Sequence, residues 1–222
     1  PFEAHVQRTL LDPLGMARAR FSAEVPADPL MARGHFRGEA RDEPALRDVP
    51  AGGLTASVND LARFVAMQFE DGRDRLGREV LGAAEVAAMQ AEQPLGQPLN
   101  QDLRMGLGWM RSTFGEDTVH GGGPVLHHAG ATFFHRAQLM MLPRHRLGVV
   151  VMANDGAATG AVNRVAQRAL ALLLASRTGI APTPAVSGFR PAAQPWSAAQ
   201  RAALDEACGG DLFSVLGPVQ LR

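Results

Sequence analysis

The stretch Val125–Asp155, VLHHAGATFFHRAQLMMLPRHRLGVVVMAND, decides the fold. Near its end, residues 147–152 form a short apolar run rich in β-branched side chains, which is typical of a strand covered on both faces. The segment 133–142 before it is almost as apolar, and the intervening PRHRLG sequence has the proline, polar residues and glycine of a tight turn. Because strands joined so closely must be antiparallel, the sequence predicts a hairpin that is entered through a His-Ala-Gly tripeptide.

Periodic apolar residues predict helices on both sides of this hairpin. Three precede it and one follows it, at residues 2–11, 58–70, 83–90 and 157–177. In the second helix, Ser57 is a good N-cap and Asp60 completes a variant of the capping box. The last helix has six apolar residues on its expected buried side: Val162, Val165, Ala166, Ala169, Leu172 and Leu173. Helices first, then strands, then a closing helix favour an α+β fold over alternating βαβ units.

Other segments have weaker patterns. Residues 17–50 combine prolines and charges with little periodicity, and they are interpreted as a long irregular excursion of the kind that often surrounds a binding site. The sequence MGLGWM at 105–110 is interpreted as a short strand whose glycines allow close approach to a neighbour. Residues 181–196 are rich in proline and are expected to form a linker. Residues 197–222 are expected to begin an accessory segment that is cut short.

The composition narrows the classes of function. In 222 residues with a formal net charge of zero, the arginines are spread along the sequence, which argues against a nucleic-acid interface. No apolar run approaches the ~20 residues that a membrane-spanning helix needs. The single cysteine, Cys208, cannot form an internal disulfide, so the cellular compartment stays open. The chain contains neither lysine nor tyrosine, which excludes any mechanism that takes either side chain from these residues.

Four segments resemble, in order, elements of one enzyme family: the serine hydrolases of the β-lactamase, DD-peptidase and esterase type (penicillin-recognising, class C-like). They are FEAHVQRTLLDPLGM at 2–16, PAGGLTASVNDLARF at 50–64, MGLGWM at 105–110 and HHAGATFFHRAQLMMLPRHRLGVVVMAND at 127–155. The resemblance covers residues 1–180 and implies the C-terminal portion of that family's domain. This portion comprises part of the helical domain, then the last antiparallel strands and the closing helix of the sheet domain.

Members of this family use three catalytic sequence elements. A Ser-x-x-Lys helix carries the nucleophilic serine, Tyr-x-Asn supplies a second base or proton shuttle, and Lys- or His-x-Gly on an edge strand lines the site. A serine hydroxyl needs a neighbour that takes its proton, and the acyl oxygen needs donors where negative charge develops. The resemblance therefore implies an acyl-enzyme reaction on amide or ester bonds, of the D-aminopeptidase, DD-peptidase or esterase type.

Only the third element has a counterpart in this chain. His128 and Gly130 match His-x-Gly, and Ala131 matches the position whose backbone N–H forms half of the oxyanion hole. These three are the expected catalytic residues, and Ala129 and Thr132 are the expected substrate contacts. Ala129 departs from the Thr or Ser that is frequent in the family, which removes a hydroxyl from the site. A histidine at 128 is more similar to the peptidase and esterase members than to the true β-lactamases.

The Ser-x-x-Lys and Tyr-x-Asn elements lie upstream of the matched segments in the family. The chain, which opens at Pro1 without an initiator methionine, is therefore expected to be a fragment that is inactive alone and that lacks the N-terminal half of the same protein as a partner. Its substrate is expected to be a small molecule or a peptide, with no cofactor and no metal. A second hypothesis is a non-catalytic ligand-binding or scaffolding remnant of the same fold.

The histidines of the hairpin have structural alternatives. Without the family context, His128 would be interpreted as a structural histidine at the start of a strand. His127 is expected to face the opposite side of that strand, because side chains alternate. Together with His120 these residues suggest a metal site, but adjacent strand residues cannot easily face one ion and no acidic residue has a regular ligand spacing to them.

Four other side chains have simple structural interpretations. Trp109 is expected in the core and not as a substrate platform. Ser57 is explained by its capping role and not by nucleophilic chemistry. His135 and Arg136 are interpreted as a solvated strand face.

Overall fold

The computed structural model describes residues 1–93, 104–111, 119–181, 197–199, 202, 212–214 and 217–219. The chain divides into two compact units, Pro1–Gly188 and Phe189–Arg222. In the second unit, β9 (Leu212–Ser214) and β10 (Gly217–Val219) pair as an antiparallel hairpin. The predicted linker, apart from Ala181, lies outside the described residues.

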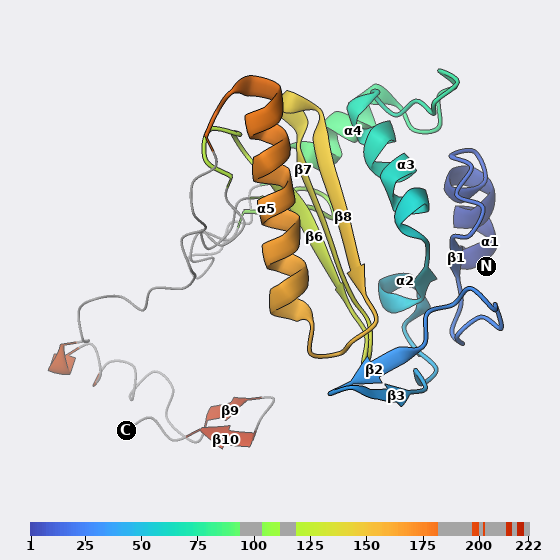
Figure 1. The fold of residues 1–222 in the computed structure, drawn as a ribbon, viewed down its shortest axis with the longest axis vertical. Coiled ribbons are helices and arrows are strands. Elements are labelled where there is room, and N and C mark those ends of the chain that lie inside the picture. The colour runs from blue at the N-terminus through green and yellow to red at the C-terminus, as the bar shows by residue number, and fades with distance from the viewer. Residues whose placement is uncertain are drawn as a thin grey trace. The chain divides into compact units, whose positions relative to one another are not determined.

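A four-stranded antiparallel sheet forms the centre of the first unit (Figure 1). Its strands, in spatial order, are β5 (Met110–Arg111), β6 (Leu126–Ala131), β7 (Arg136–Leu142) and β8 (Leu147–Ala153). The predicted hairpin is confirmed as β7 and β8. They are joined by the 3-10 turn η2 (Pro143–His145) and by Arg146, whose φ of 54° closes the turn in the left-handed region.

The closing helix α5 (Thr159–Thr178) covers one face of the sheet, where it packs on β7 and β8 (Figure 1). Its buried stripe has a four-residue spacing: Val162, Ala166, Leu170 and Leu174. The prediction that Val165, Leu172 and Leu173 are also buried is wrong, since these side chains are 55%, 48% and 43% exposed. The helix packs mainly on two strands near one edge of the sheet, so only a narrow stripe is covered.

Helix α3 (Val58–Phe69) packs on the opposite face of the sheet. The core between them contains Val65, Trp109, Leu126 and Met141. Strand β8 is thus covered on both faces, as its sequence predicts. The capping box is also confirmed: the Ser57 hydroxyl accepts a hydrogen bond from the Asp60 N–H, and the Asp60 carboxylate accepts one from the Ser57 N–H.

The N-terminal elements form a further core around the outer side of α3, in addition to the core under α5 and the core between α3 and the sheet. Helix α1 (Phe2–Val6) continues into one π-helical turn, η1 (Gln7–Leu11), and α4 (Ala83–Gln90) has the predicted bounds. The buried members of this core are Leu11, Leu14, Met16, Ala19, Met67 and Val86. The expected excursion at 17–50 contains short elements only: β1 (Arg20–Phe21), β2 (Gly34–Phe36), β3 (Glu39–Arg41) and α2 (Val49–Gly52), followed by β4 (Leu54–Thr55).

The prediction of a strand over residues 105–110 is wrong for most of that segment. Met105 bridges Met110, and the Gly106 N–H donates to the Trp109 carbonyl at 2.7 Å, so the glycines form a tight turn. Gly108 has a φ of +76°, which favours glycine. Among the described residues, no helix is both long and apolar enough to span a membrane.

Candidate active site

The expected site residues lie at the end of β6. His128, Ala129, Gly130 and Ala131 are consecutive and all exposed, and each pairs with a residue of β7. Thr132 follows in the turn to β7. The Nδ1 atom of His128 lies 2.8 Å from the Ala129 carbonyl oxygen, which can only accept. This contact favours the tautomer that carries the proton on Nδ1, so the neutral ring presents Nε2 as a hydrogen-bond acceptor or base.

The two adjacent histidines face opposite sides of the sheet, as predicted. His127 is 7% exposed and pairs with Met140, which belongs to the core under α5, and its Nδ1 atom lies 3.5 Å from the Gln138 amide nitrogen. Leu126 belongs to the core under α3, and His128 lies two residues further on the same face. His128 and Gly130 therefore occupy the α3 face of the sheet, beyond the packed part of that core.

The glycine at 130 is not demanded by packing. A Cβ atom added there would meet only the Ala137 Cβ, at an ordinary contact distance of 3.4 Å. Its φ also lies outside the left-handed region, since it is not among the positive-φ glycines. The absence of a side chain therefore leaves a bare, exposed stretch of backbone on the α3 face.

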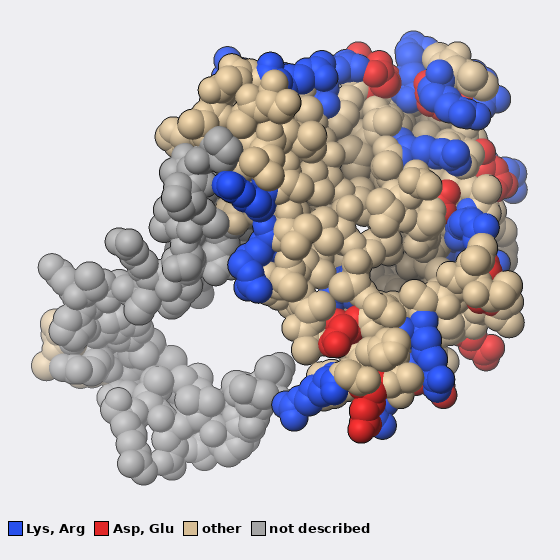
Figure 2. All heavy atoms as spheres, viewed as in Figure 1, with Lys and Arg blue, Asp and Glu red and all other residues tan. Residues whose placement is uncertain are grey.

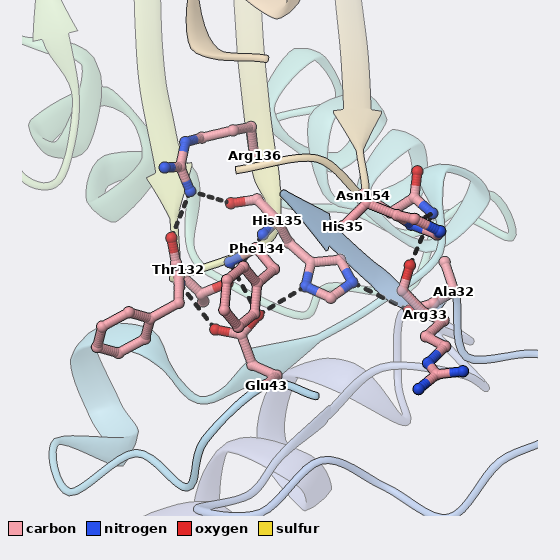
Figure 3. Close-up of polar contacts among 10 residues, drawn as sticks. Ala32, Arg33, His35, Glu43, Thr132, Phe134, His135, Arg136 and Asn154 are labelled. Atoms are coloured by element: carbon pink, nitrogen blue, oxygen red, sulfur yellow. Dashed lines mark hydrogen bonds and ion pairs between the residues drawn. The ribbon is translucent and has the colours of Figure 1, made fainter. Parts of the chain in front are cut away.

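The turn between β6 and β7 is held by a carboxylate from a distant part of the chain (Figure 3). The Phe133 N–H donates to Glu43 Oε1 at 2.8 Å, and the Phe134 N–H donates to Glu43 Oε2 at 3.1 Å. His135 Nδ1 lies 2.9 Å from the same Oε2 atom. The Glu43 side chain is only 7% exposed. Burial raises the pKa of Glu43, but hydrogen bonds from His135, Thr132, Phe133 and Phe134 outweigh it and lower the pKa below its ordinary value.

The carbonyl groups of the same turn are held by Arg136. Its guanidinium donates to the Thr132 carbonyl, to the His135 carbonyl at 2.7 Å and to the Thr159 hydroxyl at 2.9 Å. The interpretation of His135 and Arg136 as a solvated strand face is therefore wrong. Local patterning could not reveal their roles, because the partner of His135 lies 92 residues earlier in an irregular segment.

Strand β2 ties the same excursion to the end of β8. The His35 N–H donates to the Asn154 carbonyl at 2.8 Å, and the Asn154 side-chain amide donates to the Arg33 carbonyl at 2.8 Å. The His135 Nε2 atom lies 3.0 Å from the Ala32 carbonyl oxygen. Residues 32–43 are thus attached at several points beside the exposed end of β6 (Figure 3).

Two further interpretations from the sequence concern Trp109 and Ser57. Trp109 is 3% exposed and stacks on Phe64, so its place in the core is confirmed. The Ser57 hydroxyl donates to the Asp60 carboxylate at 2.8 Å while it accepts the Asp60 N–H, so it is committed to the cap. In the described part of the chain, no group of three or more His, Cys, Asp or Glu residues is arranged to hold a metal ion. Cys208 lies outside the described residues.

Comparisons with known proteins bear on the family and the fold of this chain. A sequence model of the Beta-lactamase family matches residues 1–174. The fold is similar to the octameric penicillin-binding protein homologue from Pyrococcus abyssi, with a TM-score of 0.61 and 24% identity over 78% of this chain and 37% of that one. It is also similar to the crystal structure of SurE, with a TM-score of 0.60 and 23% identity over 88% of this chain and 44% of that one.

This chain spans less than half the length of either solved structure. A search of curated protein sequences found no match. The family match covers most of the chain, and the α+β architecture of helices with an antiparallel sheet is consistent with part of a β-lactamase/transpeptidase-like fold. The chain therefore belongs to the Beta-lactamase family.

Proposed function

We propose that this chain is the C-terminal portion of a serine hydrolase that acts through an acyl-enzyme on amide or ester bonds, of the D-aminopeptidase, DD-peptidase or esterase type. The substrate is a small molecule or a peptide that lies along the exposed end of β6. The observation that carries the proposal is the exposed His128–Ala131 strand end, with a bare glycine backbone that packing does not require.

Each residue of this strand end has a role in the proposal. The Gly130 backbone allows the substrate to approach closely, and the Ala131 N–H is a donor for the oxyanion that develops on the acyl group. His128 presents Nε2 toward the leaving or attacking group as an acceptor. Ala129 and Thr132 contact the substrate on either side, and Ala129 does so without a hydroxyl.

The nucleophile and its base come from outside this chain. A hydroxyl nucleophile requires an adjacent group that takes its proton, and the family's elements for this purpose contain Lys and Tyr, which are absent here. We infer that the N-terminal half of the same protein supplies Ser-x-x-Lys and Tyr-x-Asn.

Two surface features support such a partner. Among the described strands, β8 pairs with β7 on one side only, which leaves a row of backbone groups available at its other edge. The exposed side chains of α5 include Val165, Leu172 and Leu173. In Figure 2 the surface over β8 and the adjoining side of α5 is largely tan, and blue side chains lie along the other side of α5. An additional strand beside β8 would pair with this edge and cover apolar surface.

The test compares the isolated chain with the polypeptide that joins it to the proposed N-terminal half. Both are incubated with p-nitrophenyl esters, D-amino-acid amides and a chromogenic cephalosporin. The joined polypeptide should hydrolyse at least one of these three classes of substrate, and the isolated chain should show no hydrolysis above background. Turnover by the isolated chain would contradict the proposed division of the site.

The absence of lysine and tyrosine also favours the second hypothesis, a non-catalytic ligand-binding or scaffolding remnant. In that case the joined polypeptide would neither hydrolyse a substrate nor become acylated, although it would still bind an ester or amide at β6. Calorimetric titration with a non-hydrolysable substrate analogue separates binding from turnover.

A further inference from the structure

We propose that Glu43 and His135 are positioning residues for the end of β6, and that protonation of His135 tightens their hold on the turn that follows Ala131. The consequence for an oxyanion donor at Ala131 rests on the proposed function. The contacts of Glu43 and His135 with the turn do not depend on it.

The turn leaves its backbone little freedom. The N–H groups of Phe133 and Phe134 donate to the two oxygens of Glu43, and the Thr132 N–H donates to the His135 carbonyl at 3.1 Å. The Thr132 and His135 carbonyls accept from Arg136, the residue that pairs with Ala131. The Glu43 carboxylate therefore binds backbone N–H groups of the turn, and the Arg136 guanidinium binds its carbonyl groups, both next to Ala131. Such charge-assisted hydrogen bonds are stronger than neutral ones.

The carboxylate is itself held in place by its surroundings. Glu43 follows β3 and approaches the turn beside β2, whose Gly34 lies so close that a Cβ atom there would be 2.6 Å from the Phe134 Cβ. The same Cβ would lie 3.3 Å from the His135 Cε1. The backbone of Gly34 thus lies directly against the side chains of Phe134 and His135, and the Glu43 carboxylate reaches the backbone N–H groups of the turn (Figure 3).

His135 faces two acceptors at once. Nδ1 lies 2.9 Å from the Glu43 carboxylate and Nε2 lies 3.0 Å from the Ala32 carbonyl. A neutral imidazole has one N–H and can satisfy only one of them, whereas the imidazolium donates to both. Protonation therefore adds one hydrogen bond to the excursion and converts the contact with Glu43 into an ion pair.

The other charged or titratable groups around His135 are directed elsewhere. The Arg136 guanidinium contacts the His135 carbonyl, not the ring, and Arg33 on the excursion pairs with Asp42 at 3.6 Å. His35 Nδ1 lies 3.3 Å from the Asn154 amide, and the Asp155 carboxylate accepts the Ala157 N–H at 2.7 Å. The direct ring contacts that respond to protonation are therefore Glu43 and the Ala32 carbonyl.

The direction of the pH effect follows from these contacts. Histidine gains its proton between about pH 8 and 5. Glu43 stays ionised in mild acid, because its hydrogen bonds lower its pKa despite burial. The hold on the turn should be strongest in mild acid and weaker in mild alkali.

The test is hydrogen exchange of the 222-residue chain by ¹H–¹⁵N NMR, expressed as protection factors so that the intrinsic pH dependence cancels. Between about pH 5.5 and 8, protection of the Phe133 and Phe134 amides should fall by about tenfold, and the Ala131 amide resonance should shift with the same midpoint. Glu43→Gln should lose about tenfold protection at the acid end. His135→Gln should remove the pH dependence.

The matched controls are Glu39→Gln, an exposed carboxylate of the same excursion, and His5→Gln, an exposed histidine of α1. Both should behave like the wild type, and protected amides of α5 should report that every variant is folded. Wild-type protection in Glu43→Gln, or an unchanged pH profile in His135→Gln, would overturn the proposal. Hydrogen exchange can be measured without any catalytic activity. The outcome of this experiment is therefore independent of whether the protein is a hydrolase.

Discussion

Gly148 of β8 lies so close to Val65 of α3 that a Cβ atom on the glycine would stand 2.4 Å from Val65 Cγ1. The helix therefore packs directly on the strand backbone. Valine has one strongly preferred rotamer in a helix, so its methyl groups cannot turn aside. This contact fixes α3 on the same face of the sheet that carries His128 and Gly130.

Gly148→Ala should destabilise the chain by about 1–3 kcal/mol, because the added methyl overpacks this contact. Val65→Ala removes the clashing Cγ1 atom, so the double variant should lose less stability than the sum of the two single variants. Urea unfolding monitored by circular dichroism measures all three. Gly130→Ala is the matched control and should change stability by less than about 0.5 kcal/mol, since its Cβ has room. Strict additivity would show that the two residues do not touch.

Substitution of the two adjacent histidines, His127 and His128, should change the free energy of unfolding to different extents. His127→Ala should cost about 1–3 kcal/mol, because it alters a buried polar group in the core under α5. His128→Ala should change the free energy of unfolding by less than about 0.5 kcal/mol, since the side chain is exposed. Thermal and urea denaturation provide the comparison. A large loss of stability in His128→Ala would favour a structural histidine at that position.

The cap of α3 should contribute measurably to folding. Ser57→Ala removes the hydroxyl that accepts the Asp60 N–H and should cost about 1 kcal/mol. Ser176→Ala, an exposed position inside α5, should be neutral or slightly stabilising because alanine is the better helix former. Equal free energies of unfolding for the two variants would contradict the capping role.

The buried carboxylate predicts how stability depends on acid. The pKa of Glu43 is lowered in the folded chain, so its contribution is present above the unfolded pKa and is lost as pH falls through the folded pKa. Below about pH 5.5, the difference in stability between the wild type and Glu43→Gln should therefore shrink as the pH falls. Urea midpoints between about pH 3 and 5.5 test this, with Glu39→Gln expected to follow the wild type. A difference that grows as the pH falls through this range would reverse the sign of the argument.

The sequence predicts elements whose signals are local. The apolar runs of β7 and β8, the capping box of α3 and the bounds of α4 are all set by neighbouring residues. The predicted inward stripe of α5 is broader than the buried one, because the helix sequence does not encode how many strands the helix packs on. The glycines at 105–110 permit both a strand and a turn, and Gly106 is settled by Met89 of α4, whose carbonyl oxygen would lie 2.2 Å from an added Cβ.

The site divides in the same way. The placement of His127 and His128 on opposite faces follows from strand alternation, but the face that each one occupies depends on helices from other parts of the chain. Glu43 could not be assigned, because its contacts span 90 residues or more and it comes from an excursion without periodicity. The role of Arg136 is not predictable for a related reason, because a charged strand residue has the pattern of a solvated one and its carbonyl partners are set by the shape of the turn.

The most direct test of the central claim is mass spectrometry after incubation with an acylating substrate. The polypeptide that joins this chain to its proposed N-terminal half should gain one acyl group on the serine of Ser-x-x-Lys. Gly130→Val should reduce that adduct by obstructing the strand backbone, while the isolated 222-residue chain should gain none. An acyl group on a serine within the 222 residues, or acylation of the joined polypeptide that is indifferent to Gly130→Val, would contradict the account.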